Sequence, residues 1–505
     1  MLSRVHSGAV IGIEGLPVLV EVNTDLPGDP KFITVGLPDT AVKESQDRVG
    51  SALMNHGFSM PKMRTIVNLS PGNLRKEGPI YDLPIALGVI KSTQQAFLQR
   101  LDEFIIAGEL GLSGNLLPIS GAIALAMQAR KHKKKLLLPK VSAEMAAFVS
   151  DVETFGANTL DEVVQFLSQK KELPKVSQAV NLEDQRGVFD VDFSEVKGQA
   201  TLRRAIEVAV AGGHNLLMIG TPGSGKSMVA KRIPTIMPTP TLEEFLEILS
   251  IYSLGHMTNM VVALGRPFRA PHHTISDAGL LGGGSYPGPG EVSLAHHGVL
   301  FLDELPEFRR STLEVLRQPL EDGWISISRS SAKVQFPCSF MLIAAMNPCP
   351  CGFLGDPKRE CLCSPGQIQR YRSKISGPLL DRIDIHIDVR PINVKEMRYQ
   401  KPAESSAAIR QRIVKAREIQ KLRNRKDCTI NAKMGYGDLV RFCQLDVRSE
   451  TLLTSAIEAL SLSARAHDRI LKVARTIADL EGVENIGETH LLEAIHYRSM
   501  DRKLF

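Results

Sequence analysis

The sequence predicts an α/β chain in which a parallel-sheet core lies between an α+β amino-terminal region and a helical carboxyl-terminal region. With 505 residues, the chain is too long for one hydrophobic core. Strand-like and helix-like segments alternate after residue 190, which is typical of a parallel sheet. Within this stretch an apolar run leads into a glycine-rich turn and then a helix-compatible run. We therefore expect domains over residues 1–170, 191–395 and 396–505, with a linker at 171–190.

The composition is that of an ordinary globular protein. Hydrophobic residues make up 43% and charged residues 23% of the chain, so disorder is not expected. No apolar run reaches the roughly 18 residues of a membrane span. Seven cysteines in so long a chain do not resemble a secreted disulfide framework, and we expect a cytoplasmic protein. The net charge of +6 permits a polyanionic partner without requiring one.

The amino-terminal region combines short β-branched runs with helix-like stretches. The runs Val18–Val22, Thr65–Leu69 and Phe104–Ala107 are predicted strands, separated by Gly-Pro, Pro-Gly and Ser-Gly turns. A basic run, Arg130–Lys135, ends one predicted helix. A solvated helix end is the favoured interpretation of that run, with a nucleic-acid patch as the alternative.

The region beyond residue 400 is predicted to be helical. Ile409, Ile413 and Ala416 form an apolar stripe, and we expect the remaining face to be solvated. The basic residues on that face are Arg410, Arg412, Lys415, Arg417, Lys421 and Arg423.

The glycine-rich turn of the core is a Walker A match in the expected context. Leu216–Ile219 is a predicted buried strand, and MVAKRI after the turn is helix-compatible. Glycines let successive backbone N–H groups face the phosphates, while Lys226 supplies charge and the Ser227 hydroxyl ligates Mg²⁺. The predicted nucleotide-binding residues are Gly220, Thr221, Pro222, Gly223, Ser224, Gly225, Lys226 and Ser227.

Two further strand tips carry the polar groups that ATP hydrolysis needs. The run GVLFLDE ends in Asp303, predicted to hold Mg²⁺ through water, and Glu304, predicted to polarise the attacking water. A helix-capping Asp at a strand end is the alternative, which the neighbouring Walker A match disfavours. The apolar run Phe340–Ala345 leads to Asn347, whose amide would orient the water. We therefore predict an ATP hydrolase that uses Mg²⁺.

Arginines complete the predicted site. Arg382 precedes a β-branched strand in SGPLLDRIDIHIDV and is predicted to reach a neighbouring subunit's γ-phosphate, although an ordinary ion pair is the alternative. Arg465 begins a predicted helix and would contact the phosphates from a helical lid, with Arg469 as the competing residue.

This set of strand tips resembles the AAA+ superfamily. The wording RPFRAPHHTISDAGLLGGG, followed by PGEVSLAHHGVLFLDELPEF, is similar to its magnesium-chelatase-like branch, and the whole chain resembles the ComM/YifB family. The resemblance implies an AAA+ core with a helical lid and an oligomeric ring, usually a hexamer. It also implies action on DNA, namely branch migration during integration of incoming single-stranded DNA by homologous recombination in natural transformation.

On this resemblance, two loops are expected to contact DNA. The segment between Phe268 and Ala295 would be an insertion in the second core helix, with Tyr286 in its glycine-rich tip. The stretch GWISISRSSAKVQFP resembles the pore hairpin of replicative helicases and places Arg329 at its tip. A surface hairpin and a flexible glycine loop are the alternatives.

Four of the seven cysteines cluster in CPC and CLC: Cys349, Cys351, Cys361 and Cys363. Four thiolates in a short loop match a structural Zn²⁺ site in number, although the C-x-C spacing departs from the common C-x-x-C. Unliganded thiols are the alternative. A metal-bound loop would present Phe353, Lys358 and Arg359, as a further candidate DNA contact. Cys428 and Cys443 lie apart and are expected to be packing residues.

Residues 1–170 resemble the Lon-protease-like domain, a fold also found in a ribosomal small-subunit protein. Active Lon enzymes use a Ser–Lys dyad, but Ile80 and Ile123 stand at the matching places in KEGPIYDLPIALGVI and LPISGAIALA. Without nucleophile or base we expect no protease activity. The domain would instead support ring assembly or channel DNA.

Two other functions compete with the DNA motor. A magnesium-chelatase subunit driving metal insertion into a porphyrin has a similar core but is expected to lack this amino-terminal domain. A nucleotide-dependent scaffold would need a broken hydrolysis site, yet Lys226, Asp303, Glu304 and Arg382 are all present.

Overall fold

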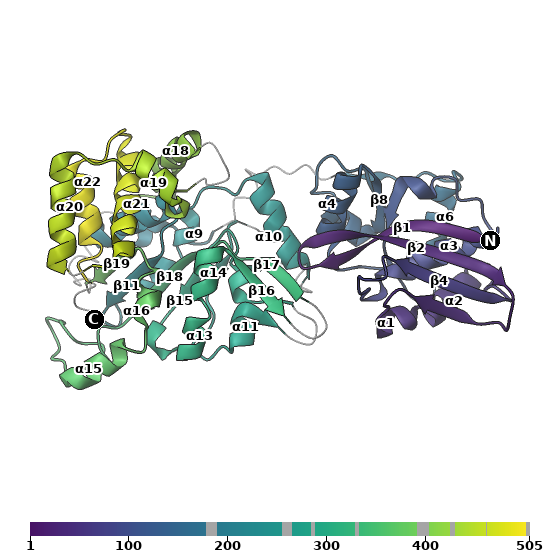
Figure 1. Ribbon diagram of the computed structural model, residues 1–505, viewed down its shortest axis with the longest axis horizontal. Coiled ribbons are helices and arrows are strands. Elements are labelled where there is room, and N and C mark those ends of the chain that lie inside the picture. The colour runs from purple at the N-terminus through teal and green to yellow at the C-terminus, as the bar shows by residue number, and fades with distance from the viewer. Residues whose placement is uncertain are drawn as a thin grey trace. The chain divides into compact units, whose positions relative to one another are not determined.

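The computed structural model describes eight stretches of the chain, which form two compact units (Figure 1). The described residues are 1–177, 189–254, 265–283, 288–328, 333–390, 403–424, 430–460 and 462–500. The first unit comprises Met1–Asn181 with Leu242–Val261, and the second comprises Leu182–Thr241 with Val262–Phe505.

The first unit is built on two four-stranded sheets, which confirms the predicted α+β class. One sheet has the order β1-β2-β4-β3, with only β3 and β4 parallel; the other has the order β10-β9-β8-β5. The strands are β1 (Leu2–Ile11), β2 (Glu14–Leu26), β3 (Phe32–Val35), β4 (Arg64–Ser70), β5 (Phe104–Ile106), β6 (Glu109–Leu110), β7 (Leu116–Leu117), β8 (Lys135–Pro139), β9 (Thr154–Ala157) and β10 (Lys175–Val176). The helices are α1 (Thr40–Lys43), α2 (Ser45–Asn55), α3 (Asp82–Ser92), α4 (Ala122–His132), α5 (Lys140–Ala146) and α6 (Leu160–Leu167).

Close packing of α3 on the first sheet explains a glycine in the middle of a helix. A Cβ on Gly88 would lie 2.5 Å from Cγ2 of Val22, so only glycine lets the helix approach the strand this closely. Ser3 on β1 donates a hydrogen bond to the Gly88 carbonyl at 2.7 Å. The core of this unit therefore forms where α3 meets β1 and β2.

The linker predicted at residues 171–190 does not begin where expected. Lys175 and Val176 form β10, which pairs antiparallel with Phe155 and Thr154 of β9. Hydrogen bonding of this short strand continues the sheet, which polarity alone did not reveal. Residues 178–188 of the predicted linker lie outside the described residues.

The first unit also contains a helix from far along the chain, α10 (Leu242–Leu254). The ring of Phe245 packs edge-on against Phe148, with centroids 5.7 Å apart. The carbonyl of Ser253 accepts a hydrogen bond from the backbone of Gly121 at 3.3 Å. The sequence analysis placed α10 in the core, because this helix follows the glycine-rich turn in the chain.

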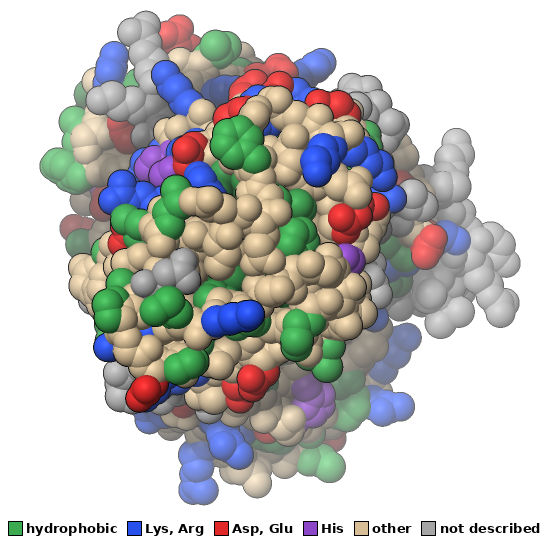
Figure 2. All heavy atoms as spheres, turned by 90° about the vertical axis from the view of Figure 1, so that its right-hand side faces the viewer, with side chains coloured by type: hydrophobic (Ala, Val, Ile, Leu, Met, Phe, Trp, Pro, Cys, Tyr) green, Lys and Arg blue, Asp and Glu red, His purple; other side chains and the backbone are tan. Residues whose placement is uncertain are grey.

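The basic run Arg130–Lys135 lies at the end of α4, as predicted. Arg130, Lys131 and Lys133 are exposed, whereas Lys135 pairs with Glu103 at 2.8 Å. Figure 2 shows the Lys and Arg side chains on one face interspersed with Asp and Glu rather than gathered in one patch. The exposure of Arg130, Lys131 and Lys133 agrees with a solvated helix end.

The second unit contains a five-stranded parallel sheet with the order β12-β15-β18-β11-β19. All residues of β11, β15 and β18 are buried, as expected for a parallel sheet covered on both faces. The strands are β11 (Leu216–Gly220), β12 (Phe268–Arg269), β13 (Gly282–Gly283), β14 (Gly288–Pro289), β15 (Val299–Leu302), β16 (Trp324–Ser328), β17 (Lys333–Pro337), β18 (Met341–Met346) and β19 (Ile385–Val389).

Helices cover this sheet and form the carboxyl-terminal region, in agreement with the prediction. The helices of the core are α7 (Ala200–Gly212), α8 (Lys226–Ala230), α9 (Ile233–Ile236), α11 (Asp277–Leu281), α12 (Glu291–Leu294), α13 (Arg310–Glu314), α14 (Arg317–Asp322), α15 (Pro365–Arg372) and α16 (Gly377–Leu380). The carboxyl-terminal helices are α18 (Ser406–Asn424), α19 (Tyr436–Phe442), α20 (Val447–Leu460), α21 (Ala464–Glu481) and α22 (Glu488–His496). None of the helices in the described part of the chain combines the length and the apolar composition that crossing a bilayer requires.

The apolar stripe of α18 is buried as predicted, but its arginines are not simply solvated. Arg412 pairs with Glu207 at 2.5 Å, and Arg417 donates to the carbonyl of Val210 at 2.7 Å. Arg410 contacts the carbonyl of Thr235. Lys415 and Lys421 are exposed. The expectation of a wholly solvated face was therefore wrong, because guanidinium groups reach back from the helix edge to the core.

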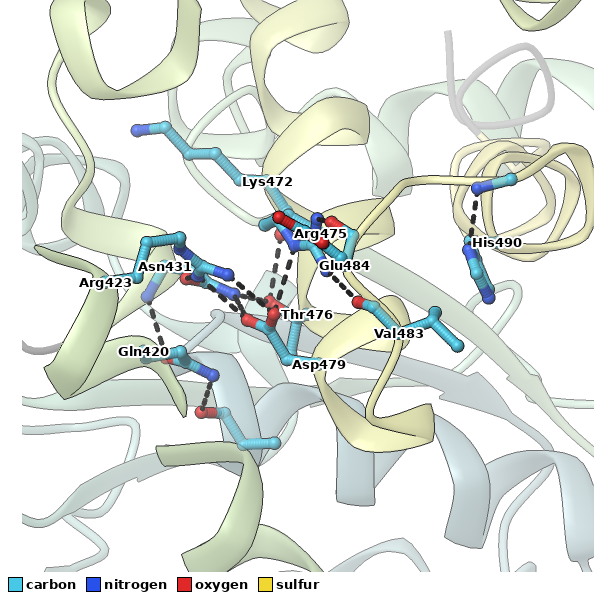
Figure 3. Close-up of polar contacts among 12 residues, drawn as sticks. Gln420, Arg423, Asn431, Lys472, Arg475, Thr476, Asp479, Val483, Glu484 and His490 are labelled. Carbon is cyan, nitrogen blue, oxygen red and sulfur yellow. Dashed lines mark hydrogen bonds and ion pairs between the residues drawn. The ribbon is translucent and has the colours of Figure 1, made fainter. Parts of the chain in front are cut away.

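A buried polar network joins α18 to α21 (Figure 3). The Asp479 carboxylate accepts hydrogen bonds from Arg423 at 2.7 and 2.9 Å, from Arg475 at 3.0 Å and from Asn431 at 2.8 Å. Asn431 also donates to Thr476 at 3.0 Å. One fully buried carboxylate thus holds two guanidinium groups in place, and burial is tolerated because the charges are paired.

Removing that carboxylate should destabilise the helical region. Asp479→Ala leaves two arginines buried without their counter-ion, at a cost of about 3–5 kcal/mol in the free energy of unfolding. Thermal and denaturant unfolding measure the loss. Glu458→Ala, at an exposed position of α20, is the matched control. Equal stability of the two variants would show that the network contributes little.

Candidate nucleotide site and cysteine cluster

The glycine-rich turn connects β11 to α8 in the arrangement predicted for a phosphate-binding loop. Gly223 and Gly225 have φ values of 75° and 89°, a left-handed conformation that favours glycine. Gly220 ends the strand against β19, where a Cβ would lie 2.4 Å from the carbonyl oxygen of Val389. Backbone conformation and close packing therefore require glycine at these positions.

Lys226 lies inside this loop and holds its shape. Its Nζ donates to the carbonyl of Gly220 at 2.6 Å and to that of Thr221 at 3.1 Å. It also donates to Oδ1 of Asn347 at 3.3 Å, so the first and third predicted strand tips meet. Burial lowers the pKa of Lys226, while the nearby carboxylates of Asp303 and Glu304 act to raise it.

The two carboxylates lie beside the loop as predicted. The Ser227 hydroxyl donates to Oδ2 of Asp303 at 2.5 Å, which places a hydroxyl and a carboxylate oxygen where Mg²⁺ would bind. The Glu304 backbone, with φ of 52°, donates to Asp303 Oδ1 at 2.9 Å. Oε2 of Glu304 lies 3.7 Å from Nδ1 of His273, a neighbour that the sequence did not suggest. The oxygen donors fit a hard divalent cation.

A cavity of about 350 Å³ opens beside the loop, and the sequence analysis missed its lining. Gln199, Asp388 and His496 contribute to it from three separate parts of the chain. The Gln199 amide donates to the carbonyl of Ser224 at 2.8 Å, which connects the cavity to the phosphate loop. No spacing in the sequence marks these residues, because only the fold brings them together.

Arg382 lies at the amino ends of the parallel strands, whereas the phosphate loop lies at their carboxyl ends. In the parallel pairing of β11 with β19, Leu216 faces Ile385 and Gly220 faces Val389. Arg382 precedes β19 and so lies near the start of β11, about 13 Å of strand from Gly220. It is buried, forms an ion pair with Glu321 and donates to the carbonyl of Pro378 at 2.6 Å.

The two arginines of α21 have different environments. Arg469 forms an ion pair with Asp384, which is buried and also lies 3.4 Å from His214. Burial would raise the pKa of Asp384, but the charge of Arg469 and the contact with His214 lower it overall. Arg465 is exposed and, like Arg382, is near enough to Glu321 to lower the pKa of that carboxyl group. Arg469 is thus committed to a structural ion pair, whereas Arg465 is exposed.

Two of the five predicted DNA-contacting residues lie outside the described part of the chain. The hairpin of GWISIS is present as antiparallel β16 and β17, but Arg329 at its tip lies outside the described residues, as does Tyr286. The insertion predicted between Phe268 and Ala295 was drawn too broadly. Phe268–Arg269 is an edge strand of the main sheet, and among the described residues β13 and β14 lie between α11 and α12.

The four cysteines of CPC and CLC come together. Their Sγ atoms lie within 4.8 Å of one another, and Cys349 is buried. A hydrogen bond from the backbone of Phe353 lowers the pKa of Cys351 to about 6. The guanidinium carbon of Arg359 lies 5.1 Å from the centroid of the Phe353 ring. Lys358 and Arg359 are exposed. We call Cys349, Cys351, Cys361 and Cys363 the four-cysteine cluster. Cys443 is buried as a packing residue, and Cys428 lies outside the described residues.

The positions predicted to lack the protease dyad carry only alkyl side chains in the structure. Ile80 lies in the short turn before α3, and Ile123 is fully buried in α4. Neither residue offers a nucleophile or a base.

Comparisons with known proteins agree with this geometry. Family models described as "Magnesium chelatase, subunit ChlI", "Subunit ChlI of Mg-chelatase" and "Magnesium chelatase, subunit ChlI C-terminal" match residues 192–397, 20–142 and 403–498. The chain is 45% identical to competence protein ComM of Haemophilus influenzae over 100% of this chain and 98% of that protein. It is 42% identical to the protein YifB of Escherichia coli, with the same coverage. A magnesium-chelatase 67 kDa subunit of Chlorobaculum parvum is 24% identical over 42% of this chain and 28% of its own length.

The contacts of Lys226 predict how two variants differ. Lys226→Ala removes the cation inside the loop and should lower nucleotide affinity and reduce ATP turnover by about 100-fold or more. Glu304→Gln keeps the loop intact and should bind nucleotide normally while losing turnover to a similar extent. Equilibrium binding of a fluorescent ADP analogue and phosphate release measure the two effects. ATP turnover by Lys226→Ala at the wild-type rate would contradict the assignment of this loop.

Proposed function

The chain belongs to the ComM/YifB family of magnesium-chelatase-like AAA+ ATPases, and on this premise we propose that it forms a ring that translocates on DNA. Its proposed role is branch migration while incoming DNA is integrated by homologous recombination in natural transformation. The observation that carries the proposal is the end-to-end match to a relative named competence protein ComM. The proposed assembly is a homo-oligomer, most simply a hexamer.

ATP hydrolysis follows from the groups gathered at the carboxyl edge of the sheet. The loop N–H groups and Lys226 bind the phosphates, and the cavity beside Gln199 has room for the nucleoside. Ser227 would ligate Mg²⁺ directly and Asp303 would hold it through water, and the bound ion would neutralise phosphate charge. Glu304 orients and polarises the attacking water, and Asn347 completes the polar set through its contact with Lys226.

A ring is supported by the place of the arginines. Arg382 cannot reach the phosphates of its own subunit, because the length of β19 separates it from the loop. A second copy of the chain, packed with its nucleotide site against this edge, would receive Arg382. Arg465, which is exposed at the start of α21, would contact the phosphates from the helical lid. A repeated head-to-tail contact of this kind forms a ring where its rotation closes.

DNA as the partner is supported by the family and by the chemistry of the predicted loops. Arg329 at a hairpin tip, Tyr286 in a glycine-rich turn, and Lys358 and Arg359 near the four-cysteine cluster provide cations and an aromatic ring. Cations bind the phosphate backbone and aromatic rings stack on bases. A Zn²⁺ ion in the four-cysteine cluster forms part of the same proposal.

A magnesium-chelatase subunit remains the alternative function. The amino-terminal domain does not argue against it as strongly as the sequence analysis assumed, because a model described as a magnesium-chelatase subunit matches residues 20–142. The DNA motor is favoured by similarity: the match to ComM spans the whole chain at 45% identity, whereas the match to the 67 kDa chelatase subunit spans 42% at 24%.

Mixing two inactive variants tests the shared site. Arg382→Ala and Glu304→Gln should each lack ATP turnover, but a co-assembled 1:1 mixture should recover about a quarter of the wild-type rate, since a quarter of the interfaces would be intact. Lys226→Ala mixed with Glu304→Gln is the control, because both residues belong to one subunit's site and no interface is restored. An inactive Arg382→Ala mixture would contradict the trans arginine.

DNA dependence tests the remainder of the proposal. ATP turnover should rise on addition of DNA, and the ring should displace a labelled strand from a three-stranded junction. Arg329→Ala should impair displacement while leaving DNA-independent turnover unchanged, because the hairpin does not contribute to the phosphate site. A ring that shows neither stimulation nor displacement would contradict the motor and favour the chelatase alternative.

A further inference from the structure

The four-cysteine cluster has the geometry of a tetrathiolate metal site. Zn–S bonds of about 2.3 Å in a tetrahedron place the sulfur atoms roughly 3.8 Å apart. In the structure Cys349 Sγ lies 3.3 Å from Cys351 Sγ and 3.6 Å from Cys361 Sγ, and the latter two are 3.6 Å apart. The fourth sulfur, of Cys363, lies within 4.8 Å of the others. The four thiols therefore surround one point closely enough to share an ion.

Disulfide bonding does not explain this cluster. A disulfide brings two sulfur atoms to about 2.05 Å, well below the shortest distance here. Ordinary packing of reduced thiols does not explain it either, because only Cys349 of the four is buried. Sulfur ligands without nitrogen or oxygen partners favour Zn²⁺ among the common divalent metals.

The segment between the cysteine pairs has little else to fix its shape. Residues 352–360 contain no helix or strand, and Leu362 between the last two cysteines is 88% exposed. Asp356 bridges the backbone of Lys358 at 2.7 Å and of Arg359 at 3.2 Å, which orders only the tip. A bound metal would cross-link the two ends of this segment and supply the missing constraint.

This segment also contacts the phosphate loop of the same unit. Gly352, with φ of 83°, lies so close to Pro222 that a Cβ there would be 2.6 Å from the Cδ of the proline ring. The first cysteine of the cluster, Cys349, comes two residues after Asn347, whose Oδ1 contacts Lys226. Beyond the cysteines, α15 returns to this place, where Arg372 donates to the carbonyl of Pro348 at 3.1 Å. The residues around the four-cysteine cluster thus contact the phosphate loop at Pro222 and the backbone next to Asn347.

We propose that the four-cysteine cluster binds one Zn²⁺ ion, and that the metal-bound segment is a clamp on the turn at Pro222 and on Asn347. Zinc occupancy then sets the affinity of the site for nucleotide. This inference rests on the proposed ATPase site and deepens it, since it assigns a control element to that site. The ion has no part in the chemistry; it fixes the backbone that the loop packs against.

Metal content tests the first half of the proposal. Purified wild-type protein should carry about one Zn²⁺ per chain, and a Cys361→Ser, Cys363→Ser double variant should carry almost none. Cys443→Ser, at a buried cysteine outside the cluster, should keep its zinc. Replacement by Co²⁺ should produce the strong charge-transfer absorption of cobalt thiolates. Wild-type protein that holds no stoichiometric metal would overturn the zinc site.

Nucleotide affinity tests the clamp by a variant that keeps all four cysteines. Gly352→Ala should retain zinc but weaken binding of the fluorescent ADP analogue by about tenfold or more, because the added methyl group displaces the loop at Pro222. Gly355→Ala is the matched control. It has nearly the same φ, 81°, but nothing within 4 Å of an added Cβ, so it carries the same backbone strain without the contact.

The outcomes separate the clamp from the proposed function. Wild-type affinity in Gly352→Ala, or an equal loss in Gly355→Ala, would overturn the clamp even if zinc is present. Restored affinity on returning Zn²⁺ to metal-stripped wild-type protein would support it. Neither binding nor metal content depends on DNA or on turnover. A failure of the DNA assays would therefore leave this test intact.

Discussion

The parallel register of β11 and β19 imposes the main constraint on this protein. It places the phosphate loop at the carboxyl ends of the strands and Arg382 at their amino ends. The length of β19 therefore separates the loop from Arg382 within one subunit. A buried lysine, two carboxylates and an amide gather at the carboxyl ends. The amino ends of the strands carry the guanidinium groups of Arg382 and Arg469. In the proposed assembly, one chain carries two complementary halves of a site, and contact between copies would join them.

The carboxyl-terminal helices are attached to the sheet at the amino ends of its strands. Asp384, two residues after Arg382, is paired with Arg469 of α21 and approached by His214, which in turn bonds to Thr476 at 2.8 Å. Thr476 belongs to the network around Asp479 (Figure 3). A continuous set of buried polar contacts thus runs from the amino ends of the strands into the carboxyl-terminal helices. In the proposed ring, these contacts would transmit a movement of the helices to Arg382.

The sequence predicted the parts of the site that depend on local pattern, and missed those that depend on distant packing. The strand before the loop follows from its apolar run, and the loop follows from glycines that can adopt positive φ values. Both features depend on neighbouring residues alone, and the sequence therefore predicts them. The cavity at Gln199 and the pairing of Arg469 with Asp384 arise from segments far apart in the chain. For the same reason α10 was assigned to the core, although it packs with the first unit. Polarity alone also hid β10 and the anchoring of the arginines of α18.

The placement of α10 bears on how the first unit is connected to the rest of the chain. The chain passes between the two units three times, and the second passage follows α9, soon after the phosphate loop. Phe245 fixes α10 against Phe148 of the first unit. The first unit is therefore joined to the segment that follows the phosphate loop, and not only to the beginning of the second unit. In the proposed motor, such a connection would link the first unit to the nucleotide site through the chain itself.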